Sequence, residues 1–227
     1  METKEIKLFK KNGELVSYNV GKPMARGSHA KVYRIGKDRC LKKFNIFPFK
    51  YDMEMFDIFL ESDLANFYKI YELLYNRKIR LDAYDMKFYK EDVFNIIDIP
   101  TDYILDNFSS ILMSINILSR KGIQVRDLIP INLIFSKDGI TVIDVDSYRR
   151  LKDCDKDELA AKNELALVKV LQELMLANLI GYYSDDENIG KYLRANDGLF
   201  RTNKFSDISK KLVRCKTPMD YYRGRNC

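Results

Sequence analysis

The sequence has little of what a zinc centre or a disulfide framework needs. It contains one histidine, His29, and four widely spaced cysteines, Cys40, Cys154, Cys215 and Cys227. No two cysteines form a C-x-x-C pair and no ligand-spaced neighbour accompanies His29, so we expect no zinc site. Scattered cysteines without a secretion signal predict free thiols in a reducing compartment.

Long apolar runs are also missing. The start, residues 1–11, is charged and lacks the apolar centre of a signal peptide. The longest apolar stretch near the end, residues 165–180, is broken by Lys169, Gln172 and Glu173. It therefore predicts an amphipathic helix, because a membrane span needs about 20 consecutive apolar residues. We expect no membrane partner and a cytoplasmic location.

Composition gives an ordinary globular balance. The chain has 227 residues, 46% of them hydrophobic and 32% charged, which suits one domain with a core of its own. Tryptophan is absent, and Tyr and Phe supply the aromatic bulk. The net charge of +6 suits a phosphate-handling protein, a nucleic-acid binder or neither, so it decides nothing.

The order of elements changes from strands to helices along the chain. Alternating apolar residues and turn signals predict strands over 6–9, 15–20, 31–35, 40–44, 67–75 and 78–89. Helical spacing predicts helices over 51–64 and 103–121, the second ended by Gly122, and a mostly helical chain from Asp157 onward.

One constellation of polar residues stands out from its apolar surroundings. Asp127 precedes Asn132 by five residues, and Asp144 follows after one turn. Burying three such groups without partners would be costly, and a metal and a substrate hydroxyl are suitable partners. Asn132 and Asp144 are hard oxygen ligands suited to Mg²⁺, and Asp127 could accept a proton from a hydroxyl. The alternative is a hairpin with polar turns and capping carboxylates.

Two features in the first quarter of the chain could contact phosphate. Ala25 to Tyr33 forms a tight, small-residue loop between two predicted strands, whose backbone N–H groups could approach phosphates. A plain hairpin remains open as the alternative. Lys42 lies on the next strand, with Lys43 expected on the opposite face and Glu54 on the following helix as a candidate partner.

Taken in order, these segments resemble the protein-kinase-like superfamily, in its minimal bacterial Ser/Thr-kinase-like form. Residues 25–32 are similar to the glycine-rich loop, with only the central Gly27 retained, and 40–42 to the strand that carries the phosphate-contacting lysine. Residues 126–132 resemble the catalytic loop, Asp144 the metal-binding Asp of D-F-G, and 163–167 the start of the central helix. The resemblance covers about residues 15–180.

The resemblance implies an α+β, bilobal kinase-like fold in a single domain, 1–227. Residues 1–87 would form a small antiparallel β N-lobe with one helix, and 88–227 a helix-rich C-lobe. It implies ATP and Mg²⁺ as cofactors, with catalytic Asp127, Lys42 and Asn132, and with Asn132 and Asp144 as metal ligands. The implied nucleotide-binding residues are Gly27, Ser28, Ala30, Val32, Lys42, Glu54, Met86 and Phe88.

Several positions depart from the kinase pattern. Val125 replaces the usual His, Ile129 the Lys of many Ser/Thr kinases, and Asp146 the Gly of D-F-G. Residues 145–162 contain no A-P-E-like triplet, so we expect a reduced activation segment without phosphorylation control. Small-molecule kinases also carry a second acid at the Asp146 position.

The function implied is transfer of the γ-phosphate of ATP to a hydroxyl, for which we favour Ser or Thr of a protein. A small-molecule kinase and a catalytically inactive pseudokinase are the alternatives within the superfamily. Compact kinases of this kind include effectors delivered to a host cytosol. A nucleic-acid-binding module using the basic, aromatic stretch from Arg194 to Arg225 is an alternative of another class, and we expect nucleic acid not to be the partner.

Overall fold

The computed structural model describes residues 3–45, 53–90, 99–182 and 197–223. The fold is α+β, and the chain divides into two compact units. Unit 1 comprises Met1–Leu64 and Tyr68–Lys90, and unit 2 comprises Ala65–Phe67 and Glu91–Cys227. Each unit has buried apolar residues of its own.

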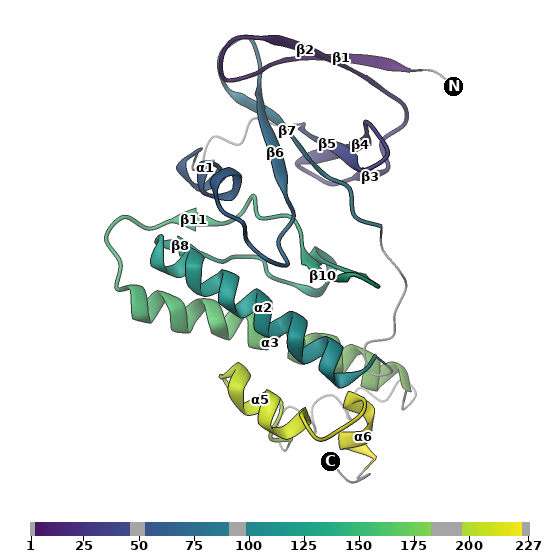
Figure 1. The fold of residues 1–227 in the computed structure, drawn as a ribbon, viewed down its shortest axis with the longest axis vertical. Coiled ribbons are helices and arrows are strands. Elements are labelled where there is room, and N and C mark those ends of the chain that lie inside the picture. The colour runs from purple at the N-terminus through teal and green to yellow at the C-terminus, as the bar shows by residue number, and fades with distance from the viewer. Residues whose placement is uncertain (1–2, 46–52, 91–98, 183–196, 224–227) are drawn as a thin grey trace. The chain divides into compact units, whose positions relative to one another are not determined.

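Unit 1 is a curled antiparallel sheet with one helix (Figure 1). Its seven strands run in the order β2-β1-β6-β7-β5-β4-β3, and helix α1 (Met53–Glu61) packs against β6. The strands are β1 (Lys4–Phe9), β2 (Leu15–Val20), β3 (Ala25–Arg26), β4 (Ala30–Arg34), β5 (Arg39–Phe44), β6 (Ile70–Tyr75) and β7 (Leu81–Lys87).

The period-2 pattern of these strands forms the unit 1 core. Side chains that alternate along a strand reach the same face of the sheet, so their apolar members meet. The buried cluster contains Ile6, Leu8, Val20, Tyr33, Leu41, Leu74 and Ala83.

Three strand predictions need correction. The strand expected over 78–89 begins only at Leu81 and ends at Lys87, because hydrogen bonds within residues 76–80 form a turn before it. The strand expected over 67–75 begins only at Ile70, because Asn66 has a left-handed φ of 62° and Phe67 instead forms a parallel bridge with Val142 of unit 2. Ala25 and Arg26, which the sequence analysis assigns to a loop, form the short edge strand β3 against β4.

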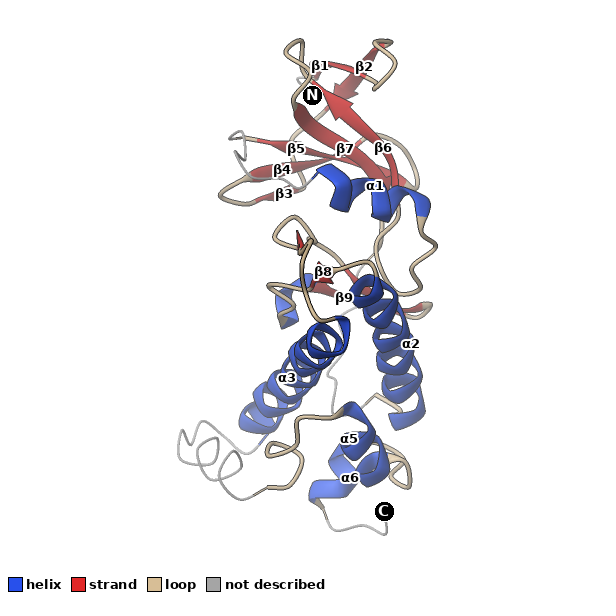
Figure 2. Ribbon diagram, turned by 90° about the vertical axis from the view of Figure 1, so that its left-hand side faces the viewer, coloured by secondary structure: helices blue, strands red, loops and turns tan. Residues whose placement is uncertain are grey.

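Unit 2 is built on two long helices, α2 (Thr101–Arg120) and α3 (Lys156–Tyr182), which pack against each other (Figure 2). Apolar residues recur on α2 every three or four positions and are buried, as expected for an amphipathic helix. Two shorter helices follow, α5 (Phe205–Leu212) and α6 (Pro218–Tyr222). Small two-stranded ladders join β9 (Leu133–Ser136) to β10 (Gly139–Val142) and β8 (Ile123–Gln124) to β11 (Arg149–Arg150).

Gly122 ends α2 as the sequence predicts. It has a φ of 78°, and its N–H donates to the carbonyl of Ser119 at 2.9 Å. A Cβ at this position would lie 2.7 Å from the Leu151 carbonyl oxygen, which is too close for any side chain. Glycine is therefore required both by the backbone conformation and by the close approach of residue 151.

The apolar stretch 165–180 lies in α3, as expected. No helix among the described residues combines the length and the apolar character that crossing a bilayer requires. Cys40 and Cys154 are free thiols as predicted, but Cys215 is disulfide-bonded, so the expectation of four free thiols is wrong.

A buried carboxylate joins β7 to β5 in unit 1. The side chain of Asp85 is fully buried and accepts hydrogen bonds from the guanidinium of Arg39, whose side chain is 51% exposed. Burial raises the pKa of Asp85 above its ordinary value of 3.8, and Arg39 opposes this rise. The folded state therefore binds this proton more tightly than the unfolded chain, so the stability contribution of Asp85 falls as the pH rises above 3.8.

Replacing Arg39 should reveal the free-energy cost of burying the Asp85 carboxylate. We expect Arg39→Met to lower the free energy of unfolding at neutral pH by about 1–3 kcal/mol, less than for a fully buried pair because half of Arg39 is exposed. The loss should shrink as the pH falls from about 7 toward about 4, since Asp85 then becomes protonated. Urea unfolding at several pH values measures this.

Adding Asp85→Asn to Arg39→Met should restore most of the stability, since no buried charge then remains. Lys37→Met is the matched control, because Lys37 is exposed and makes no ion pair with any described residue. An Arg39→Met loss that is equal at all pH values would contradict an electrostatic origin.

Candidate functional site

The polar constellation of the sequence analysis lies in unit 2 on segments that hydrogen bonds tie together. A short 3₁₀ turn, η2 (Pro130–Asn132), carries Asn132 into β9. Beyond the end of the β9–β10 ladder, the N–H of Ile143 donates to the carbonyl of Asn132 at 2.8 Å. This bond places Asp144, the next residue, beside Asn132.

The amide of Asn132 is oriented by its own neighbour in the loop. Its nitrogen, Nδ2, donates to the backbone carbonyl of Asp127 at 2.8 Å. The amide oxygen, Oδ1, accepts no hydrogen bond from any residue that the structure describes. The acceptor atom of Asn132 is therefore left for a further ligand, and oxygen is the donor type that Mg²⁺ prefers.

Both aspartates occupy the left-handed region of the backbone. Asp127 has a φ of 50° and Asp144 a φ of 60°, and both side chains are exposed. Such conformations are rare outside glycine, and Asp is among the residues that tolerate them best. Strained backbone of this kind clusters at functional sites, where the surrounding structure maintains it.

The pKa of Tyr148 depends on its burial and on the charges of Asp144 and Asp127. Tyr148 is 3% exposed, and burial raises the pKa of its hydroxyl, with the carboxylates of Asp144 and Asp127 raising it further. Both carboxylates thus act on this one buried hydroxyl. A divalent cation fits this combination of a free amide oxygen and an exposed carboxylate. Within the described residues, no three His, Cys, Asp or Glu side chains form a metal-binding group.

The side chain of Asn163, on α3, holds the segment before Asp127 in place by hydrogen bonds. Asn163 is fully buried, and its Oδ1 accepts from the N–H of Val125 at 2.9 Å. Its Nδ2 donates to the carbonyl of Ile123 at 2.9 Å and to the Ser119 hydroxyl at 2.8 Å. The sequence marks Asn163 only as the start of a kinase-like helix. Its role is visible only in the fold, because the bonded residues lie about 40 positions earlier.

A second hydrogen bond, from Ser147, holds the end of this segment next to Asp127. The hydroxyl of Ser147 donates to the backbone carbonyl of Arg126 at 3.2 Å. Val125, which replaces the usual His, is buried. Arg126 itself is half-buried.

In unit 1, the structure distinguishes the two neighbouring lysines of β5. Lys42 is only 7% exposed, and its ammonium lies 5.7 Å from the ring centroid of Tyr84. Lys43 points to the other face and forms an ion pair with Asp82 at 2.8 Å. Lys42 is therefore the buried lysine with an aromatic neighbour. Glu54 is exposed in the first turn of α1, and its pairing with Lys42 stays a prediction.

The candidate phosphate loop is a tight hairpin tip between β3 and β4. The N–H of Gly27 donates to the carbonyl of Ala30 at 2.9 Å, which closes the turn. The backbone N–H groups of Ser28 and His29 donate to no described residue and are exposed. Two free donors at a tip suit an anion, although the structure equally fits the plain hairpin considered above. Ala30 is buried, and Val32 is half-buried and paired with Lys42.

The two remaining candidates lie at the end of β7. Met86 is half-buried and pairs with Cys40 of β5. The ring of Phe88 is covered on one face by the guanidinium of Arg34, at 3.5 Å from its centroid. Met86 is thus part of a strand, and one face of Phe88 is already occupied.

The structure thus brings Asp127, Asn132 and Asp144 together in unit 2. In unit 1 it places Lys42, Val32 and Met86 on adjoining strands, and Gly27, Ser28 and Ala30 at the hairpin tip.

A scan of protein-family models and a search of curated proteins find no match to the chain.

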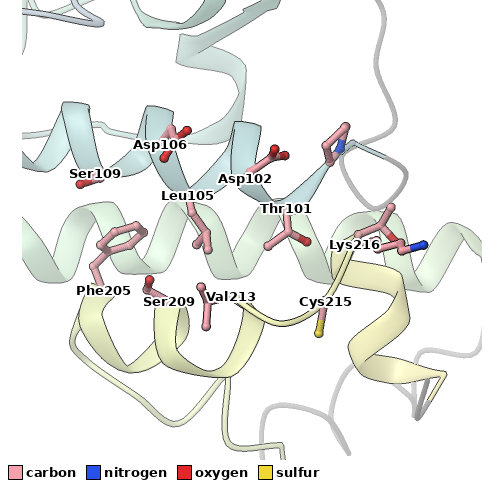
Figure 3. Close-up of a pocket in the computed structure, with 12 residues that line it drawn as sticks. Thr101, Asp102, Leu105, Asp106, Ser109, Phe205, Ser209, Val213, Cys215 and Lys216 are labelled. Atoms are coloured by element: carbon pink, nitrogen blue, oxygen red, sulfur yellow. The ribbon is translucent and has the colours of Figure 1, made fainter. Parts of the chain in front are cut away.

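A cavity of unit 2 is lined by none of these candidate residues. It measures about 700 Å³ and is bounded by α2, by α5 and by residues 213–217 (Figure 3). Leu105 and Phe205 point into the space between the two helices, and Asp102 and Asp106 lie along α2. Its α2 residues belong to the first half of the helix, whereas Gly122 and the segment leading to Asp127 follow its last turn. None of the residues that line the cavity belongs to the loop of Asp127, to η2 or to the β9–β10 hairpin.

One aromatic residue of the basic C-terminal stretch packs inside unit 2. Phe205 is 6% exposed and stacks on Phe108 of α2, with ring centroids 6.5 Å apart. The hydroxyl of Tyr222 is buried. Phe205 is therefore not available to stack on bases, whereas Phe200, Tyr221 and Tyr222 are half-buried. Arg194 and Arg225 lie outside the described residues.

Removing the Asn163 amide should destabilise unit 2. We expect Asn163→Leu to lower the free energy of unfolding by about 2–4 kcal/mol, because it leaves the N–H of Val125 and the carbonyl of Ile123 buried without a partner. Thermal and urea unfolding measure the loss. Asn116→Leu, at an exposed position of α2, is the matched control and should change stability little. Equal losses in both variants would show that the three hydrogen bonds do not stabilise the fold.

Proposed function

We propose that this chain is an ATP- and Mg²⁺-dependent phosphotransferase of protein-kinase-like type, acting on Ser or Thr hydroxyls of a protein. The bilobal kinase fold, with residues 1–87 and 88–227 as its lobes, is part of the proposal. One observation carries it: the Asn132 amide is turned by the Asp127 carbonyl so that its oxygen is free beside Asp144. A hairpin turn with capping carboxylates has no need of such a free acceptor.

In this proposal the unit 2 residues perform the chemistry. Asn132 Oδ1 and the Asp144 carboxylate would hold Mg²⁺, which when bound neutralises charge on the phosphates. The Asp127 carboxylate orients the acceptor hydroxyl and accepts its proton as the acceptor oxygen bonds to the γ-phosphorus. The bond from that phosphorus to the bridging oxygen breaks, and ADP leaves. The Asn163 and Ser147 contacts keep the base in position during this transfer.

The unit 1 residues would bind the nucleotide. Lys42 is a buried cation, for which phosphate oxygens are an ordinary partner, and Glu54 would orient it. The free N–H groups at the hairpin tip would contact phosphate, near Gly27, Ser28 and Ala30. Val32, Met86 and the uncovered face of Phe88 would contact the adenine.

Exposed apolar residues beside the base favour a protein acceptor. Ile129 is 42% exposed and Ile131 79% exposed, and both lie within four residues of Asp127. Apolar side chains suit a peptide segment better than a polar, cationic small molecule. The acid-lined cavity of unit 2 does not reverse this preference, because none of Asp127, Asn132 and Asp144 lines it.

Phosphate transfer tests the proposal directly. Purified chain should transfer label from γ-labelled ATP in Mg²⁺ to a protein mixture or to itself. Asp127→Asn and Asp144→Ala should each lower the rate about a hundredfold or more, since each removes a group that acts on the reacting atoms. Asp138→Asn is the matched control, because Asp138 is an exposed acid in the turn of the same β9–β10 hairpin. It should retain the wild-type rate.

Other outcomes separate the alternatives. Label on small hydroxylated compounds alone would replace the protein acceptor with a small-molecule one. ATP and Mg²⁺ that raise the melting temperature without transfer would indicate a pseudokinase. Neither transfer nor nucleotide binding would overturn the proposal.

A further inference from the structure

Two turns of unit 1 enclose a second cavity that the proposed phosphotransfer does not use. The turn between β1 and β2 and the turn between β6 and β7 lie side by side, because β1 pairs with β6 through Phe9 and Tyr75. The cavity measures about 330 Å³, and its walls are Phe9, Lys10, Lys11, Gly13, Tyr75, Asn76, Arg77 and Ile79. It combines apolar walls with basic residues at its rim.

Ile79 has an unexpected place in the β6–β7 turn. The N–H of Ile79 donates to the Asn76 carbonyl at 3.0 Å, and that of Asn76 donates to the Arg80 carbonyl at 2.9 Å. This is a type I turn followed by a left-handed residue, a position that glycine normally fills. Ile79 occupies it with a φ of 56°, although β-branched residues are the least suited to positive φ.

Packing does not account for isoleucine at this position. The side chain of Ile79 is 84% exposed, the largest fraction among the exposed large apolar residues described. A residue that strains the backbone and contributes nothing to a core is a poor choice for stability. An apolar side chain presented at the mouth of a cavity is, however, suited to contact a partner.

The charge around this cavity is positive and only partly neutralised. Lys10 and Lys11 already form ion pairs with carboxylates of unit 1. Arg77 and Lys78 are exposed in the same turn as Ile79 and have no ion-pair partner among the described residues. An occupant with negative charge would complement them.

The geometry points to a docking site for an acidic protein segment, one apolar side chain of which enters the cavity against Ile79 while flanking Asp or Glu residues meet Arg77 and Lys78. The cavity favours a protein over a membrane, since membrane binding scales with the apolar area buried and the turn from Asn76 to Arg80 presents one apolar side chain. It also favours a protein over nucleic acid, because of the two rings that line the cavity Tyr75 is buried and Phe9 is half-buried, which leaves neither exposed for stacking. This site is independent of the phosphotransferase proposal.

Binding of a defined peptide to the full chain tests the site. The probe is a fluorescein-labelled short peptide with one central Leu flanked by Asp and Glu, compared with the same peptide carrying Ser for Leu and with a Lys/Arg-flanked version. Fluorescence anisotropy should show that only the acidic, Leu-containing peptide binds, and that its affinity falls with salt. Vesicles of phosphatidylserine and phosphatidylcholine and a single-stranded oligonucleotide are run beside it.

The decisive variant is Ile79→Gly, because relief of backbone strain and loss of the apolar contact act in opposite directions: the first favours stability and the second weakens peptide binding. Glycine suits the left-handed position, so the melting temperature should stay the same or rise. Peptide affinity should nevertheless fall about tenfold, as for an anchor residue. Arg77→Glu with Lys78→Glu should weaken binding at least as much. Lys22→Glu with Lys37→Glu makes the same charge change at exposed positions elsewhere in unit 1 and should leave affinity within about twofold.

Three results would overturn the inference. They are absence of binding by the acidic peptide, unchanged affinity in Ile79→Gly, and binding of vesicles or oligonucleotide in preference to the peptide. A folded Ile79→Gly variant with weakened binding would establish it, since loss of structure could not then explain the effect.

Discussion

The buried amide of Asn163 is the interaction on which the arrangement of unit 2 depends. The chain leaves α2 at Gly122 and pairs with β11 over only two residues, Ile123 and Gln124. So short a ladder cannot satisfy or fix the following backbone by itself. The Asn163 side chain supplies the missing hydrogen-bond partners. It accepts from the N–H of Val125 and donates to the carbonyl of Ile123, at positions where water has no access.

This anchoring makes the strained backbone that follows possible. A left-handed conformation costs roughly 1–2 kcal/mol outside glycine, and both Asp127 and Asp144 adopt it. The hydrogen bonds from Asn132 to Asp127 and from Ile143 to Asn132 connect the two positions, so neither can relax alone. A local network fixed to helix α3 thus holds the backbone of both exposed aspartates beside Asn132.

The sequence predicted much of the fold because periodicity is a local property. The strands β2, β4 and β5, the long helix α2 and its end at Gly122 were all visible in the spacing of apolar residues and glycine. The failures have long-range causes. Phe67 has strand-like neighbours, yet it bridges to Val142, a partner 75 positions away that no local pattern indicates. For the same reason Asn163 was recognised as a helix residue and not as the support of the loop.

For the candidate site, residue type and spacing predict which residues lie close together when they belong to one loop. They do not predict features that depend on how distant segments fold together. The spacing of Asp127 and Asn132 anticipated their proximity, since both lie in one loop. Lys42 and Lys43 could be separated only by which face of the sheet is buried, and the structure decides this through the 7% exposure of Lys42 and the Asp82 ion pair of Lys43.

The four described non-glycine residues with positive φ show how strain and function can be distinguished. Asn66 is compensated by structure, because its amide donates to Asn107 and to the Ile140 carbonyl, both at 2.7 Å. Asp127 and Asp144 are side chains that tolerate the conformation, and they stand in a connected polar network. Ile79 has neither a suitable side chain nor packing to compensate it. Since folding does not require isoleucine there, its use is best explained by a contact made outside the chain.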